Sequence, residues 1–244
     1  MRSVPIPVAE TTWILVVNGD RIAHGMASPG RGRELAAGLM LSDGFIASRD
    51  DVLALDVRED RLATILDARV PERTFAAAKA AMQHREEHGC SLLHYVACDT
   101  AALAVPRHRD VPDDHVLAEA LRQLFNVCSS SFPGGGVHAA AMIGPSGADY
   151  TAIDVSRHAA VEKAAGAAIL DGADTSTCGI VLTARISGPI ALTAARSGVG
   201  WIASRSIPTT LALAIGAVAG LTVVARAGTR EVHTFVPGAG SDQQ

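Results

Sequence analysis

Arginine and hydroxyl side chains recur at four places in the C-terminal part of this 244-residue chain. Three are corners where a strand should pass into a helix, and they carry Arg157 with His158, Arg185 and Arg205. The fourth is the run Ala225-Arg226-Ala227-Gly228-Thr229-Arg230 at the end of a predicted strand. Helix N-termini and guanidinium groups both favour phosphate oxygens. We therefore predict an anion-binding site, against the alternative of scattered, solvated arginines beside helix caps.

Cys90 is the thiol best suited to nucleophilic chemistry. It follows Gly89 in a polar stretch from His84 to Asp99 that lacks helical or strand periodicity, so we expect a mobile loop there. The neighbouring His88 and Arg85 favour the thiolate, which is the nucleophile, although two adjacent glutamates oppose it. We therefore predict that Cys90 is the catalytic residue.

A metal site is the alternative use of the same stretch. Five side chains there could bind zinc: His84, His88, Cys90, His94 and Cys98. Because the stretch holds no Cys-x-x-Cys pair, we expect no metal. The other cysteines, Cys128 and Cys178, are expected to be small core or loop residues.

Composition excludes several classes of protein. The chain is 48% hydrophobic, which excludes a disordered protein, and its net charge of −4 with 4% aromatic residues argues against a nucleic-acid binder. From Thr175 onward, however, the chain has five arginines and only two acidic residues, and this positive balance suits a small anionic ligand. The apolar run 211–225 is too short to span a membrane, and the N-terminus has no secretory signal, so we expect a cytoplasmic protein.

Two segments of different character are expected to position these residues. Residues 1–125 predict a smaller α+β domain with a hairpin at Asn18-Gly19. Its expected strands are 12–17, 21–26, 52–57 and 62–66, and its expected helices are 34–41, 74–83 and 114–125.

Residues 126–236 alternate between strands and helices, which predicts a layered α/β domain, and 237–244 form a tail. The expected strands are 137–143, 150–153, 179–183, 201–204, 221–226 and 231–235. The expected helices are 157–170, 190–196 and 209–218, the last two opened by Pro189 and Pro208.

Short motifs from both halves match a known family in order. In the first half they are Val17-Asn18-Gly19, Met26-Ala27-Ser28-Pro29 and the helix-to-glycine turn from Glu34 to Ile46. In the second half they are Gly135-Gly136-Val137-His138, the run DVSRHAAVEK from Asp154 to Lys163, Thr183 to Ser187, Ser206 to Ala212, and Arg226 to Arg230. The chain thereby resembles the formate dehydrogenase accessory sulfurtransferase family (FdhD).

The resemblance implies a homodimeric sulfur carrier. Such a protein accepts sulfur from a cysteine desulfurase as a persulfide, here on Cys90, and passes it to the molybdenum bis(molybdopterin guanine dinucleotide) cofactor. This cofactor, a bound substrate held by the arginine-bearing corners, then enters formate dehydrogenase or a related molybdoenzyme. The resemblance also implies a cytidine deaminase-like fold for 126–236, but His138-Ala139-Ala140 lacks the glutamate of a zinc deaminase, so deamination is excluded.

The chain departs from the family at its cysteine pair, Cys-x-x-Cys. In one register Cys90 stands at the first cysteine, the persulfide carrier, and Leu93 at the second; in the other, Cys98 stands at the second and the carrier is lost. Gly89 favours the first register. One thiolate suffices for a persulfide, but the missing pair favours an alternative function: a paralogue that holds the cofactor as a chaperone without moving sulfur.

Overall fold

The computed structural model describes residues 7–59, 63–88, 110–144 and 149–238, which form a mixed α/β structure with two mixed sheets. The first sheet has the order β2-β1-β4-β3 and contains β1 (Thr11–Val17), β2 (Asp20–Ala27), β3 (Ala54–Glu59) and β4 (Ala63–Arg69). The second has the order β10-β9-β8-β7-β5-β6. Its strands are β5 (His138–Ile143), β6 (Asp149–Asp154), β7 (Gly179–Leu182), β8 (Trp201–Ser204), β9 (Thr222–Ala225) and β10 (His233–Phe235).

Six α-helices within these residues pack around the sheets. They are α1 (Gly32–Asp43), α2 (Glu72–His88), α4 (Asp114–Ser131), α5 (Arg157–Asp171), α6 (Gly188–Arg196) and α7 (Thr210–Ala219). Two short 3-10 helices, Arg49–Asp51 and Thr175–Thr177, complete the elements. None of these helices is long and apolar enough to cross a membrane.

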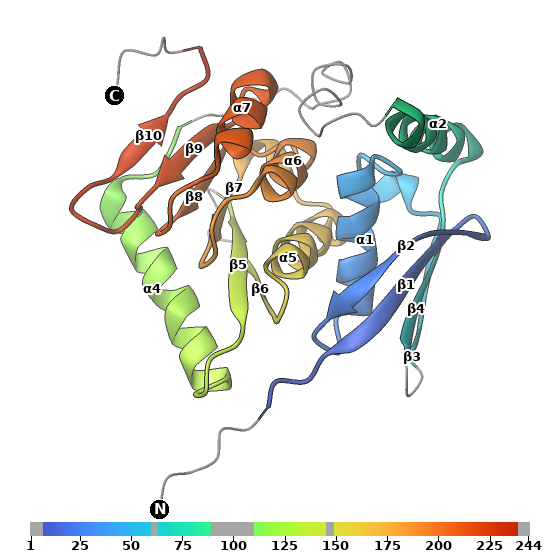
Figure 1. Cartoon of the computed structure of the whole chain (residues 1–244), viewed down its shortest axis with the longest axis horizontal. Helices are drawn as coiled ribbons and strands as arrows, with labels where there is room; N and C mark the ends of the chain where they lie inside the picture. The colour runs from blue at the N-terminus through green and yellow to red at the C-terminus, as the bar shows by residue number, and fades with distance from the viewer. Residues whose placement is uncertain (1–6, 60–62, 89–109, 145–148, 239–244) are drawn as a thin grey trace, which may run out of the picture.

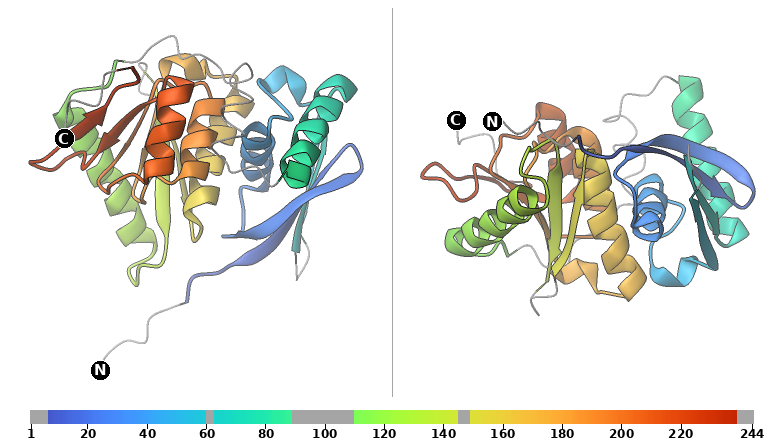
Figure 2. Two further views of the ribbon diagram at one scale, coloured as in Figure 1. Left: turned by 45° about the horizontal axis from the view of Figure 1, so that its top comes forward. Right: turned by 90° about the horizontal axis from the view of Figure 1, so that it is seen from below.

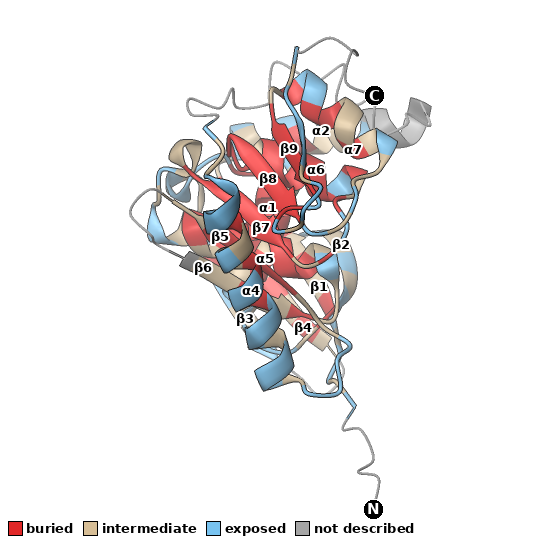
Figure 3. Ribbon diagram, turned by 90° about the vertical axis from the view of Figure 1, so that its left-hand side faces the viewer, coloured by how far each residue is buried: buried red, intermediate tan, exposed pale blue. Residues whose placement is uncertain are grey.

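The elements form successive layers (Figure 1). In the right-hand view of Figure 2, α4, the six-stranded sheet, α5, α1 and the four-stranded sheet follow one another. Helices α5, α6 and α7 lie on one face of the six-stranded sheet, and α4 lies on the other. Figure 3 shows that the central strands β7, β8 and β9 of the six-stranded sheet are buried, whereas the outer side of α4 is exposed.

Two hydrophobic clusters hold the layers together. The larger one joins the inner faces of both sheets with α1, α5, α6 and α7, and is rich in alanine. The smaller one lies under α4, where Leu117, Leu121 and Leu124 contact the outward side of the strands, including Trp201. Successive side chains of a strand point to opposite faces of the sheet, so the strands of the six-stranded sheet contribute to both clusters. This sheet is therefore covered on both faces.

Local signals account for most of the elements. The predicted hairpin is confirmed: Asn18 and Gly19 adopt positive φ angles of 50° and 89° in the turn between β1 and β2. Pro189 stands in the first turn of α6, as predicted, but Thr209 caps α7 by accepting a hydrogen bond from the Ala212 amide at 3.2 Å, so Pro208 lies just outside that helix.

Two helices extend beyond their predicted ends. α2 continues to His88 rather than stopping at residue 83, so the first five residues of the predicted 84–99 loop are helical. Those residues include arginine and glutamate, which favour a helix. They carry no apolar periodicity, so the pattern of hydrophobic residues does not reveal that the helix continues. α4 continues past residue 125, where the sequence divides its two segments, to Ser131, because Cys128 prolongs the stripe that packs under the helix.

Helices α1 and α5 cross with their backbones almost in contact. A Cβ atom at Gly38 would lie 2.0 Å from the Glu162 carbonyl oxygen, and one at Gly166 would lie 1.9 Å from the Glu34 carbonyl oxygen. Only glycine permits this approach, since the neighbours are backbone atoms that cannot turn away. The two glycines therefore set the spacing between the two halves of the protein.

Gly166→Ala is expected to lower the free energy of unfolding by about 1–3 kcal/mol, because the added methyl group forces α1 and α5 apart. This loss should exceed the gain of up to about 1 kcal/mol that alanine brings to a helix. Gly216→Ala in α7 is the matched control, since its Cβ would lie 3.0 Å from the nearest atom. Equal stability of the two variants in urea denaturation would contradict the role of Gly166.

Candidate functional site

The arginine-bearing corners lie along one edge of the six-stranded sheet. β5 runs antiparallel to both β6 and β7, and β8 and β9 continue parallel to β7, so β6, β7, β8 and β9 all point the same way. Their carboxyl ends therefore share an edge, which the chain also enters at the start of β5. In open α/β sheets this edge is the usual place for ligands.

Hydrogen bonds connect each corner along this edge to its neighbour. His158 Nε2 lies 3.3 Å from Ser187 Oγ, which joins the corners before α5 and α6. The Ser204 hydroxyl donates to the Ala184 carbonyl at 2.7 Å, which joins the corners after β7 and β8. The Arg226 amide donates to the Ser206 carbonyl at 3.2 Å, which adds the end of β9. The edge is thus a connected structure.

The structure brings all the predicted binding residues to this edge. Arg157, Arg185, Arg205, Arg226 and Arg230 are exposed, and His158 is half-buried. Within the last run, Ala225 and Ala227 are buried and Thr229 is half-buried, whereas Gly228 turns the chain at a φ of 68° against Ala118 of α4. Five exposed guanidinium groups at one edge give the site a positive character.

Two of these arginines have partners that the sequence analysis did not assign. Arg226 adopts a left-handed backbone with a φ of 54°, and its guanidinium forms an ion pair with Glu231. Arg205 lies over the ring of Phe125 on α4, with 5.9 Å between the guanidinium carbon and the ring centroid. A ligand phosphate at Arg226 would therefore compete with Glu231 for the guanidinium.

Two histidines lie at the same edge, next to Arg157. His138 opens β5 and pairs across the strands with Asp154, three residues before Arg157. Burial and the charge of Arg157 lower the pKa of His138, against the smaller attraction of Asp154. Burial, Arg157 and His138 lower the pKa of His158. Both pKa values thus lie below the ordinary histidine value, which favours the neutral imidazoles.

Asp154 itself is fully buried and fixes the corner before α5. It forms an ion pair with the buried Lys163 at 2.7 Å and accepts hydrogen bonds from the amides of Ser28 at 3.1 Å and Ser156 at 2.8 Å. Lys163 also donates to the Ser28 carbonyl at 2.8 Å. Burial, with the negative charges of Asp43 and Asp154, raises the pKa of the neighbouring Glu162 to about 8, so that carboxyl stays protonated at neutral pH.

The candidate nucleophiles Cys90 and Cys98 lie outside the described residues, so the choice between them stays open. Cys128 is half-buried on α4 and Cys178 is buried before β7, and burial raises the pKa of both thiols. The expectation from the sequence for both of these cysteines is a small core or loop residue. The alternative zinc set also falls on residues whose side chains are not described. Among described side chains, no group of three or more His, Cys, Asp or Glu residues could hold a metal ion.

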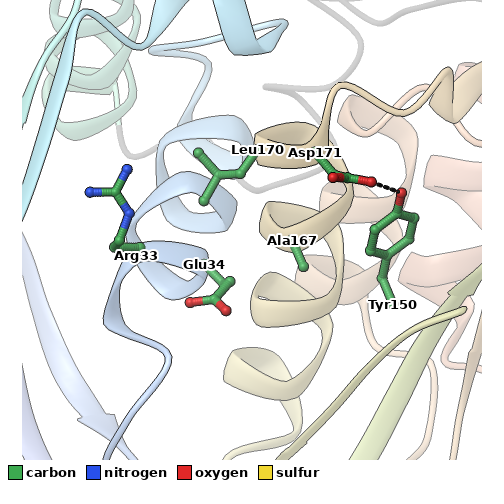
Figure 4. Close-up of a pocket in the computed structure, with 6 residues that line it drawn as sticks. All are labelled: Arg33, Glu34, Tyr150, Ala167, Leu170 and Asp171. Atoms are coloured by element: carbon green, nitrogen blue, oxygen red, sulfur yellow. Dashed lines mark hydrogen bonds between the residues drawn. The ribbon is translucent and has the colours of Figure 1, made fainter.

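Two surface cavities lie elsewhere. One, of about 420 Å³, lies between the first turn of α1 and the end of α5, where Tyr150 donates a hydrogen bond to Asp171 at 2.6 Å (Figure 4). The other, of about 440 Å³, lies beside the turn at Asn18. Neither cavity is lined by a predicted site residue.

The chain belongs to the FdhD/NarQ family, whose model matches residues 8–238. It is 31% identical to a sulfur carrier protein FdhD from Burkholderia cenocepacia over 224 residues, which cover 86% of this chain and 80% of that one. It is 30% identical to the protein of the same name from Cupriavidus necator, with 94% and 82% covered. A crystal structure of a candidate formate dehydrogenase accessory protein from Desulfotalea psychrophila matches with a TM-score of 0.70 at 21% identity, over 95% of this chain and 88% of that chain.

Several residues of the edge escaped the sequence analysis as individual site residues. His138 directly follows two glycines at a strand start, and Ser187 precedes Pro189 at a helix start, so both had local signals. Glu231 directly follows the arginine run, but an acidic residue at this position is also typical of an ordinary protein surface, so the sequence alone does not reveal its ion pair. The contact of Ser28 with Asp154 spans 126 residues and leaves no local signal.

Lys163→Met is expected to lower the free energy of unfolding by about 3–5 kcal/mol, because it leaves the Asp154 carboxylate buried without its counter-charge. The matched control is Arg58→Met, which breaks the exposed pair of Arg58 with Asp67 and should cost at most about 1 kcal/mol. Thermal and urea unfolding measure both changes. An equal loss of unfolding free energy in the two variants would show that the buried ion pair of Asp154 with Lys163 is no more important for stability than an exposed pair.

Proposed function

We propose that this protein is a sulfur carrier required for formate dehydrogenase activity. It takes sulfur from a cysteine desulfurase and transfers it to the molybdenum bis(molybdopterin guanine dinucleotide) cofactor before the cofactor enters the enzyme. The observation that carries the proposal is the gathering of five exposed arginines at one sheet edge, where the guanine dinucleotide phosphates of the cofactor would bind. The names of the relatives, sulfur carrier protein FdhD, agree with this role.

The sulfur would travel on Cys90. Its thiolate attacks the outer sulfur of the desulfurase persulfide, a new S–S bond forms on Cys90, the S–S bond of the donor breaks, and the donor cysteine leaves as a thiolate. Delivery to molybdenum as sulfide takes two electrons, which a thiol reductant supplies as it is oxidised to a disulfide. Since Leu93 stands at the second cysteine position in this register, that thiol must come from elsewhere.

Three further features belong to the proposal. The six-stranded sheet with helices on both faces is compatible with the cytidine deaminase-like layering that the family resemblance implies. The family resemblance likewise supports a homodimer. We place the protein in the cytoplasm, with the desulfurase and formate dehydrogenase or a related molybdoenzyme as partners.

A second function has one observation in its favour. The missing member of the cysteine pair fits a chaperone that binds the same cofactor through the same edge but moves no sulfur. The two functions share the arginine-rich edge and differ only in the thiol. Nucleotide binding therefore tests what they share, and persulfide formation separates them.

Arg226→Ala is expected to weaken the binding of a guanine nucleotide diphosphate by about 1.5–3 kcal/mol, the range for a hydrogen bond to a charged group. Glu231→Gln should strengthen the same binding by about 0.2–1 kcal/mol, because it removes the carboxylate that competes for Arg226. Calorimetry at fixed salt concentration measures both, with Arg58→Ala in the other sheet as the control. Unchanged affinity in Arg226→Ala would remove this arginine from the site.

Cys90→Ser is expected to abolish the uptake of one sulfur atom from a desulfurase and cysteine, and with it the activation of formate dehydrogenase, while nucleotide binding is retained. Mass spectrometry of the intact protein measures the uptake. Cys128→Ser is the control, because its half-buried thiol has a raised pKa and should not compete.

Full activation by Cys90→Ser would shift the role to Cys98 and make Cys98→Ser the next variant. If the double variant still activates the enzyme fully, sulfur transfer is refuted and the chaperone function stands.

A further inference from the structure

The edge contains a pair of imidazoles in surroundings that exclude positive charge. His138 at the start of β5 and His158 in the first turn of α5 are both half-buried and interact electrostatically with each other. Arg157 directly precedes His158 in the first turn of α5, and its charge disfavours the protonated form of both histidines. The positive N-terminal ends of α5 and α6 also point toward this corner, since His158 lies 3.3 Å from Ser187, the residue that precedes α6.

The acids near the pair are already neutralised. Glu162, one turn after His158 on α5, has a pKa raised to about 8 by burial and by the charges of Asp43 and Asp154, so it is protonated at neutral pH. Asp154, opposite His138 in the strand register, is fully buried in its ion pair with Lys163 and in its hydrogen bonds with two backbone amides. Its carboxylate is therefore largely balanced by its own partners. The other groups at this corner are the positive Arg157, the two imidazoles and the positive ends of two helices. An imidazolium ion formed here would therefore lack an unpaired negative charge to stabilise it.

An anionic ligand would supply that charge. A phosphate beside Arg157 reverses the local potential and favours the protonated form of each imidazole, which then donates a hydrogen bond from both ring nitrogens. By linkage, any ligand that raises the proton affinity of these groups binds more tightly when protons are more abundant. Histidine is suited to this coupling because its ordinary pKa lies near neutrality.

We propose that His138 and His158 form a proton-coupled pair that takes up protons when a nucleotide diphosphate diester places its phosphates beside Arg157, so that binding strengthens from about pH 8 to about pH 6. The inference rests on the proposed function, because it assigns the ligand to the same edge. It adds His138 to that site and makes the site sensitive to pH. The cofactor would accordingly be held more firmly in mildly acidic surroundings and released more readily in alkaline ones.

GDP-mannose is the probe, because its two phosphates are both esterified and do not titrate in this range. Calorimetry in two buffers of different ionisation enthalpy measures the protons taken up on binding. We expect about 0.5–1 proton per ligand near pH 6.5 and a dissociation constant about three- to tenfold smaller at pH 6 than at pH 8. The double variant H138Q/H158Q should bind with little pH dependence and no proton uptake, whereas His24→Gln, on the exposed surface of β2, should behave as the unchanged protein.

A second measurement needs no variant of either histidine. NMR titration of the imidazole nitrogens in the unchanged protein should show both rings neutral at pH 7 without ligand and partly protonated with GDP-mannose. Binding with no proton uptake, or equal uptake in H138Q/H158Q, would overturn this inference and leave the nucleotide site standing. No binding at either pH would overturn the inference and the proposed nucleotide site together.

Discussion

The buried ion pair of Asp154 with Lys163 is the interaction on which the arrangement of this protein depends. A charge in the interior is tolerated only when it is fully paired, and here the pairing draws on three separate parts of the chain. The amide and carbonyl of Ser28, which directly follows β2 of the first sheet, contact Asp154 at the end of β6 and Lys163 in the second turn of α5. The pair thereby holds the two sheets together at the point where the candidate site begins.

The site illustrates how topology can concentrate charge without a sequence motif of its own. Arg157, Arg205 and Arg226 are separated by many residues, yet each follows the carboxyl end of a strand that points the same way. Hydrogen bonds from the Ser204 hydroxyl and the Arg226 amide then connect one corner to the next, so a ligand bound at one corner would stabilise its neighbours. The spread of the arginines along the edge suits the extended phosphate-bearing ligand proposed above.

The sequence predicts the local structure well, because turn and helix signals are short-range. Asn18-Gly19 indicates its hairpin, and the apolar spacing from Val161 to Ile169 indicates α5. The predicted ends of helices are less accurate, because α2 continues through charged residues that show no apolar periodicity. The corners could be found because each contains an arginine, but Glu231 and Ser28 could not, because their roles arise only when the chain folds.

The outer edge of the six-stranded sheet has a consequence for how copies of the protein can associate. β10 is only three residues long and its residues are exposed, and Pro237, which follows it by two positions, has no amide hydrogen to offer. A neighbouring strand would find too few backbone groups to continue the sheet there, which is a common protection against edge-to-edge aggregation. The β10 edge is therefore poorly suited to pair with a strand from a second copy of the chain.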